Sequence, residues 1–172
     1  SLVAVGYQAM YNNNSGIRNT AVGYQALESN VSGGSNTACG YEALVNNTAD
    51  ANSAFGNDAL RSNTTGEKNT AVGDEALENN TTASFNTAVG HHSLTTTTNG
   101  GENTAVGQTA LELCTSGANC TAVGKGALQN VTTGSTNTGL GRLAGNDITT
   151  GTNNLCLGGE AGRSNSPSGT IN

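Results

Sequence analysis

The sequence predicts an all-β fold, a parallel β-solenoid of ten stacked coils that forms one repeat array over residues 1–172. A glycine that follows two small or apolar residues recurs every 17 residues, with one spacing of 16 between Gly40 and Gly56. Such a unit is too short for a helical hairpin and too rich in Thr, Gly and Asn for helix. Only 34% of the residues are hydrophobic, so one coil cannot be stable alone and its neighbours must stack on it. The recurring glycines are Gly6, Gly23, Gly40, Gly56, Gly73, Gly90, Gly107, Gly124, Gly141 and Gly158.

Residues at the same phase of the repeat are expected to lie about 4.8 Å apart in columns. Each coil is expected to hold a short strand, a turn, a second short strand and a looser turn. The position before the glycine is always apolar, which predicts a first core column: Val5, Val22, Cys39, Phe55, Val72, Val89, Val106, Val123, Leu140 and Leu157. A second core column is predicted four residues after the glycine: Met10, Leu27, Leu44, Leu60, Leu77, Leu94, Leu111 and Leu128.

Small residues occupy the position two before the glycine, with Gly139 and Cys156 continuing the column. Strand alternation places this column on the face opposite the first core column, where close contact with another chain would require small side chains. The predicted subunit interface is Ala4, Ala21, Ala38, Ala54, Ala71, Ala88, Ala105 and Ala122. The alternative is that Ala fits a crowded turn within one chain. The preceding Asn and Thr columns are expected to form ladders of side-chain hydrogen bonds between coils.

The two positions after each glycine vary and are expected to face outward. Tyr7, Tyr24 and Tyr41 would stack there and could contact a glycan, although stacked rings could equally serve only to cover the coil edge. Further along, Asp74 would lie over His91 and Glu75 over His92. Two imidazoles and two carboxylates can bind a divalent metal, and paired surface charges explain them equally well.

The four cysteines divide by their phase in the repeat. Cys114 and Cys120 bracket an expected outer turn and could form a local disulfide. Cys39 and Cys156 lie seven coils apart and are expected to be free, Cys39 in the core and Cys156 in the small-residue column. Sequons at Asn13, Asn30, Asn63 and Asn130 are expected near the same outer turn, where glycosylation would be accessible.

Several partners and activities are not expected. The net charge of −6 and the absence of a Lys/Arg cluster argue against nucleic acid as a partner. No apolar run is long enough for membrane insertion. No recurring group of acid, base or nucleophile suggests an enzyme, and no cofactor is implied. The chain starts inside a repeat, so we expect it to be a piece of a longer fibre protein.

The unit "NTAVGYQAL" and its copies resemble the head repeats of trimeric autotransporter adhesins and, more closely, the repeat arrays of phage tail fibres. The resemblance covers all ten units and implies a left-handed β-roll, a parallel homotrimer and an extracellular location on a cell surface or virion. It also implies a structural shaft or adhesive segment whose partner is a cell-surface glycan or receptor. In those fibres, variant units such as "NTGLGRLAGNDITTG" commonly precede an intramolecular chaperone domain.

Two alternatives remain open at the level of the sequence. A monomeric solenoid could assemble into an extracellular filament. An ice-binding protein would use regular Thr columns on a flat face, but the residue two before the strand Thr varies, so no paired Thr-x-Thr face is expected.

Overall fold

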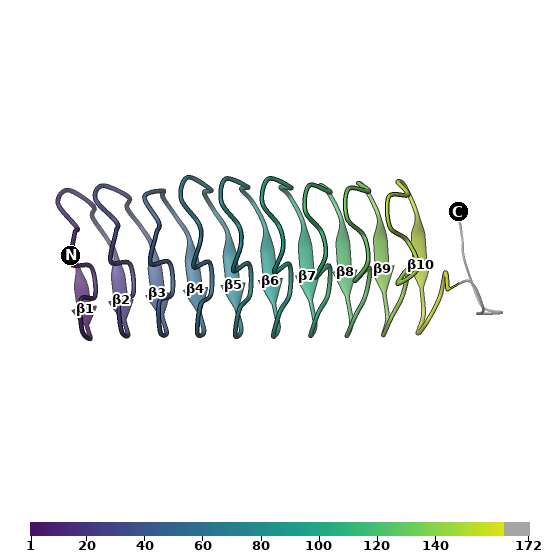
Figure 1. Ribbon diagram of the computed structural model, residues 1–172, viewed down its shortest axis with the longest axis horizontal. Coiled ribbons are helices and arrows are strands. Elements are labelled where there is room, and N and C mark those ends of the chain that lie inside the picture. The colour runs from purple at the N-terminus through teal and green to yellow at the C-terminus, as the bar shows by residue number, and fades with distance from the viewer. Residues whose placement is uncertain (164–172) are drawn as a thin grey trace.

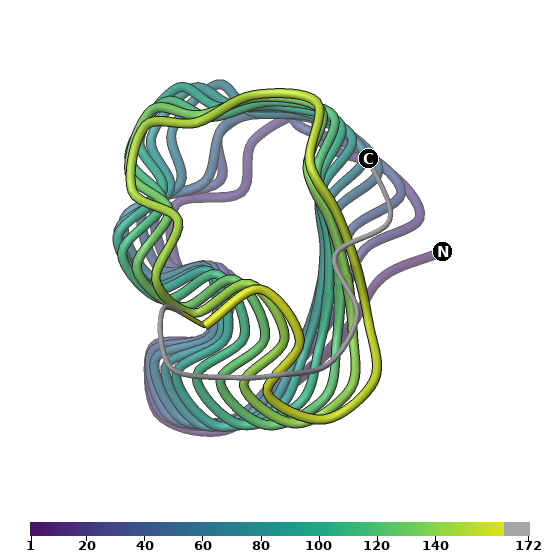
Figure 2. The ribbon, with the colours of Figure 1, turned by 90° about the vertical axis from the view of Figure 1, so that its right-hand side faces the viewer.

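The computed structural model describes residues 1–163 as a β-solenoid with no helix in the described part (Figures 1 and 2). Ten three-residue strands form one parallel sheet in the order β1 to β10, each strand pairing with the next coil's strand. The register is uniform, with Ala21 opposite Ala38 and Val22 opposite Cys39. The predicted all-β solenoid is therefore confirmed. The strands are β1 (Val3–Val5), β2 (Thr20–Val22), β3 (Thr37–Cys39), β4 (Ser53–Phe55), β5 (Thr70–Val72), β6 (Thr87–Val89), β7 (Thr104–Val106), β8 (Thr121–Val123), β9 (Thr138–Leu140) and β10 (Leu155–Leu157).

The glycine after each strand is required by the stacking of the coils. Gly23 has φ of 139°, a conformation that side chains disfavour, and a Cβ on it would collide with the carbonyl oxygen of Gly40 in the next coil. The same contact recurs along the column as far as Gly141 and Gly158. This steric requirement explains why the glycine column has no exception.

The rest of each coil is a series of turns, and the expected second strand is not formed in the described residues. Gln25 and Leu27, both with φ of 53°, adopt the left-handed conformation that makes the chain zigzag after the strand. Their backbone N–H groups still bond between coils, from Gln25 to the Tyr7 carbonyl at 2.8 Å and from Leu27 to the Ala43 carbonyl at 3.0 Å. The turns therefore continue the intercoil bonding without strand geometry.

The core confirms one predicted column and reverses the other. The Leu column is buried, and Leu27 to Leu128 are inaccessible. The apolar residues before the glycines, predicted as core, are instead outside: Val22 is 38% exposed and Phe55 43%. The Ala residues two before the glycines point inward with no exposure from Ala21 to Ala122, joined by a further Ala column that includes Ala26 and Ala43.

The reason for the reversal is the width of the coil. At Gly139, where the inward Ala column has lost its methyl group, an added Cβ would lie 2.8 Å from Cγ of Leu128 and 2.9 Å from the Ala144 carbonyl oxygen. The Leu side chain fills the interior from the opposite wall, so the strand can present only a methyl group to it. A Val side chain would overpack this space.

Two columns of buried Asn line the inner corners of the coil. In the first, Oδ1 of Asn19 accepts the backbone N–H of Asn36 at 2.8 Å, and Oδ1 of Asn36 accepts that of Asn52 at 2.9 Å. The ladder predicted for this column is thus confirmed. The second column, Asn13, Asn30, Asn47, Asn63 and Asn80, links coils through its amides, as from Asn63 Nδ2 to Asn47 Oδ1 at 2.7 Å.

Candidate functional sites

The outer surface of the sheet is the longest regular feature of the molecule, and we call it the Thr–Val face. Each strand contributes its first and third residues to it, while the second residue points into the core. The face consists of two columns. The first is half-buried from Thr20 onward: Val3, Thr20, Thr37, Ser53, Thr70, Thr87, Thr104, Thr121, Thr138 and Leu155. The second is more exposed: Val5, Val22, Cys39, Phe55, Val72, Val89, Val106, Val123, Leu140 and Leu157. Its parallel strands follow one another along the solenoid axis (Figure 1).

The hydroxyl groups of the Thr–Val face have no hydrogen-bond partner within the described residues. By contrast, Thr64 Oγ1 on the outer turn donates to the Thr81 carbonyl at 2.9 Å, and Thr81 Oγ1 donates to the Thr98 carbonyl at 3.1 Å. The ladder predicted for the strand Thr column is therefore wrong, because these side chains point away from the chain. The face offers a row of free hydroxyls beside a row of apolar groups.

The Ala column cannot be the predicted subunit interface. Its members from the second coil onward have no exposed surface, and only the first is exposed, at the open end of the stack: Ala4, Ala21, Ala38, Ala54, Ala71, Ala88, Ala105 and Ala122. The alternative, that Ala fits a crowded turn within one chain, is right about the crowding within one chain but not about the turn, because these residues lie in the strands. Any contact that needs the strand side chains must use the Thr–Val face.

The three tyrosines stack as predicted. The ring centroids of Tyr7 and Tyr24 lie 5.4 Å apart, and those of Tyr24 and Tyr41 lie 5.0 Å apart with planes inclined by 7°. Both faces of the Tyr24 ring are thus covered by its neighbours. A sugar that stacked on this ring would have to displace one of them, so the geometry favours a cover over the coil edge.

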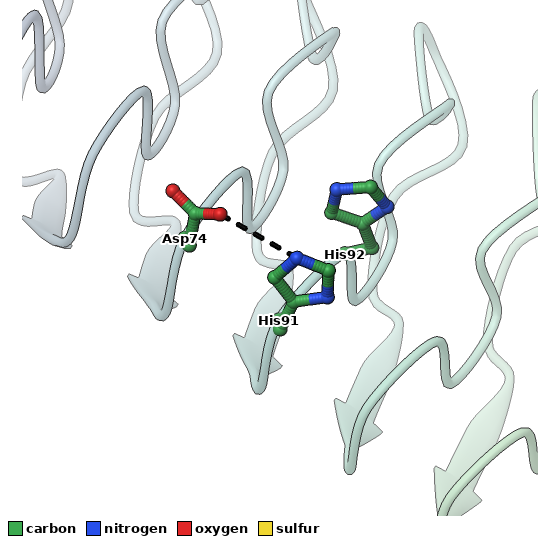
Figure 3. A group of neighbouring side chains, drawn as sticks. All are labelled: Asp74, His91 and His92. Carbon is green, nitrogen blue, oxygen red and sulfur yellow. Dashed lines mark ion pairs between the residues drawn. The ribbon is translucent and has the colours of Figure 1, made fainter.

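The predicted His and carboxylate cluster is assembled on the edge of two successive coils, and Figure 3 shows Asp74 of one coil beside His91 and His92 of the next. His91 Nε2 lies 3.5 Å from Asp74 Oδ2, and His92 Nε2 lies 2.8 Å from Glu75 Oε2, as the column register predicts. Ligand atoms of Asp74, His91 and His92 all lie within 4.8 Å of one another. Sequence reasoning missed Glu112, whose Oε1 is 3.7 Å from His92 Nδ1, because the turn brings a position five after the glycine beside this column.

Acidic groups continue from this cluster toward the N-terminus. Burial raises the pKa of Asp58 and that of Glu78, and neighbouring carboxylates add to both shifts. Arg61 lies among them, with its Nε 2.7 Å from Glu42 Oε2 and 3.4 Å from Asp58 Oδ1. This edge of the solenoid is a carboxylate-rich surface with few basic groups, suited to cations rather than anions.

Three of the four cysteines occupy positions different from those predicted. Cys114 and Cys120 lie in the core, not on an outer turn, and take the places of one Asn from each buried column. Both are free thiols, with each Sγ donating to a carbonyl oxygen at 3.4 Å, that of Gly117 and that of Gly134. Cys39 is free and exposed on the Thr–Val face instead of buried, whereas Cys156 is free and buried in the inward column.

The predicted accessibility of the sequons is also wrong for two of the four. Asn30 and Asn63 have no exposed surface, because both belong to the second Asn column. Their amides donate to the carbonyls of Gly33 at 2.8 Å and Gly66 at 2.9 Å. Glycosylation at either residue would require the folded coil to open.

Comparisons with known proteins do not assign the chain to a family. No family model matches it, and neither a curated protein nor a solved structure is significantly similar. Among the described residues no helix is long and apolar enough to cross a membrane.

Proposed function

We propose that the chain is a non-catalytic structural shaft or adhesive segment of an extracellular fibre, assembled as a parallel homotrimer through the Thr–Val face. The observation that carries this proposal is the uninterrupted apolar column of that face, from Val22 to Leu157, which lies outside the core. Exposed apolar surface of this regularity is typical of interaction sites. The outward columns after each glycine remain free to carry any recognition of a cell-surface glycan or receptor.

The extent of the face fits a contact between long parallel chains. Ten strands at about 4.8 Å give a length of about 48 Å, and three residues give a width of about 10 Å, so the footprint is about 480 Å² per chain. In a trimer each face is shared between two partners, so these ten coils would bury about 1,440 Å² over three chains but only about 480 Å² per pair of chains, below the lower limit of about 1,000 Å² for a specific interface. Because the face runs along the whole sheet, further coils would enlarge the contact in proportion.

The test uses sedimentation and the native thiol of Cys39. Val72→Lys and Val106→Lys should convert a trimer into a folded monomer of 17.1 kDa, whereas Val31→Lys, on an exposed turn outside the face, should leave the trimer intact. In the trimer, Cys39 should resist maleimide and regain reactivity in the Lys variants. A wild-type monomer in dilute solution would contradict the proposal, and open-ended polymers would favour the self-assembling filament.

A second candidate, ice binding, is favoured by the free hydroxyls of the same face. Although a strand Thr has a second Thr two positions before it only in Thr136-Asn137-Thr138, each strand from β2 to β9 except β4 pairs a Thr with an apolar residue two positions later, and β4 has Ser53 in place of Thr. A uniform array of hydroxyl and apolar groups on parallel strands can order water into a lattice. Thermal hysteresis that disappears in Thr87→Lys, measured on a monomer, would select this function over the fibre.

A further inference from the structure

We propose that Asp74, His91 and His92 form a site for a divalent transition metal, with Zn²⁺ as the ion it fits best. The proposal is independent of the proposed fibre function, because the cluster lies on the turn after the strands and not on the Thr–Val face. The bound ion would join two adjacent coils as a clamp.

The backbone brings the two histidines to the same side of the chain. Consecutive residues in a strand point to opposite sides, but His92 has φ of 55° and its ring stacks on that of His91, with centroids 3.9 Å apart and planes inclined by 11°. Figure 3 shows both rings on the side where Asp74 projects from the preceding coil. Two imidazoles and a carboxylate thereby share one small region.

The separations suit a metal site with three protein ligands. Ligand atoms within 4.8 Å of one another need to approach by only about 1–2 Å to surround an ion at about 2 Å from each. The imidazoles must turn out of their parallel stack to direct their lone pairs at one point. Their side chains are 47% and 31% exposed, so neither ring is enclosed in the core.

Neighbouring residues are placed to orient the ligands. Asn57 Nδ2 donates to Asp74 Oδ1 at 3.0 Å and leaves Oδ2 directed at His91. Glu75 lies 2.8 Å from His92 Nε2, so a proton held on that nitrogen leaves Nδ1 with the lone pair. Glu112 lies on the Nδ1 side, fixed by a hydrogen bond from Gln129 at 2.6 Å, and can supply a fourth oxygen. Such outer contacts are characteristic of histidine metal sites.

The donor set discriminates between ions. Imidazole nitrogen suits Zn²⁺, Cu²⁺ and Ni²⁺, whereas Ca²⁺ and Mg²⁺ prefer oxygen ligands in larger number. A carboxylate-rich edge without histidine would bind Ca²⁺ weakly and without specificity. The two histidines are the only ones in the chain, and they occur in one coil.

The experiment is calorimetric titration of the full chain with ZnCl₂, then with CaCl₂, together with thermal unfolding in each ion. We expect one Zn²⁺ per chain, no saturable Ca²⁺ binding and a higher melting temperature in Zn²⁺, because a ligand held only by the folded state stabilises it. His91→Gln, His92→Gln and Asp74→Asn should each weaken Zn²⁺ binding by about tenfold or more.

Glu67→Gln is the matched control, since it removes an exposed carboxylate outside the cluster and should bind Zn²⁺ like the wild type. The substituted side chains are surface groups, so circular dichroism should show the same fold for every variant. Three results would each overturn the proposal: no saturable Zn²⁺ binding by the wild type, equal affinity in the His91→Gln and His92→Gln variants, or an equal loss in Glu67→Gln.

Discussion

Replacing a buried asparagine of the first column should destabilise the coil far more than replacing an exposed one. Asn69 has no exposed surface; its Nδ2 donates to the Ala83 carbonyl at 2.9 Å, and its Oδ1 accepts the backbone N–H of Asn86 at 2.9 Å. Asn69→Ala removes both bonds. The Ala83 carbonyl keeps the amide of Asn80 at 3.1 Å, but the Asn86 N–H loses its only acceptor.

The magnitude follows from these two losses. A buried N–H without a partner costs about 1–3 kcal/mol, and the lost bond at Ala83 costs about 1 kcal/mol, so Asn69→Ala should lower the free energy of unfolding by about 2–4 kcal/mol. Asn69→Cys should cost less, because Cys120 occupies this column naturally and is buried there. Asn79→Ala, whose exposed side chain makes no hydrogen bond in the described residues, should change stability by less than about 0.5 kcal/mol.

Urea denaturation gives the global effect, and hydrogen exchange of the Asn86 amide gives the local one. Exchange is needed because a repeat array can unfold by coils, and then a single transition does not report one free energy. Faster exchange at Asn86 is expected in Asn69→Ala and not in Asn79→Ala. Equal exchange rates in the two variants would refute the assignment of the Asn column as a structural ladder.

Three further predictions concern single side chains. Oδ1 of Asn80 is buried without a partner, because Thr97 in the next coil donates to the Cys114 carbonyl at 2.9 Å instead. Thr97→Asn should supply the missing donor and raise the urea midpoint by an amount equivalent to about 1 kcal/mol. A lower midpoint would contradict this prediction. Burial raises the pKa of the Cys114 thiol to about 12, so almost none of this thiol is ionised at pH 8. Iodoacetamide treatment of a monomeric variant should therefore alkylate the exposed Cys39 and leave Cys114 intact, as measured by mass spectrometry. Ala51 has φ of 61°, a left-handed conformation that strains any residue with a Cβ. Ala51→Gly should therefore stabilise the chain by about 0.5–1 kcal/mol in urea denaturation. A loss of stability would show that the backbone is not strained there.

The repeat spacing predicted the solenoid, its register and the buried Leu column, because all three follow from the requirement that equal phases stack. It could not tell the inside of the strand from the outside. Alternation places Ala71 and Val72 on opposite faces of the sheet. Because both residues are apolar, the pattern does not determine which of them faces the core. The choice depends on the width of the coil, which is set by Leu side chains on the opposite wall and is visible only in three dimensions.

The candidate metal cluster was predictable in part for the same reason. The register alone placed Asp74 beside His91 and Glu75 beside His92. The left-handed conformation of His92, which stacks the two rings, and the approach of Glu112 depend on the turn geometry after the strand. Only Gly126 in this column signals a left-handed conformation, since Gln, Glu, Asp, Thr and Leu occupy the equivalent position in the other described coils.

The one coil of 16 residues shows how the array tolerates change. The shortening falls in the outer turn, where Asn47 and Asn52 are five residues apart instead of the six that separate Asn13 from Asn19, while β3 and β4 remain in register. In this turn Asp50 Oδ1 accepts the backbone N–H of Gly34 at 2.6 Å, much as Ser84 Oγ accepts the N–H of Glu67 at 3.0 Å from a coil of full length. A change in a solenoid needs compensation only from adjoining coils, because each coil contacts only its neighbours. For the same reason, Thr97, Cys114 and Val131 can replace asparagine in the second Asn column. Where the asparagines end, at Asn80, one buried side-chain oxygen is left without a hydrogen-bond partner.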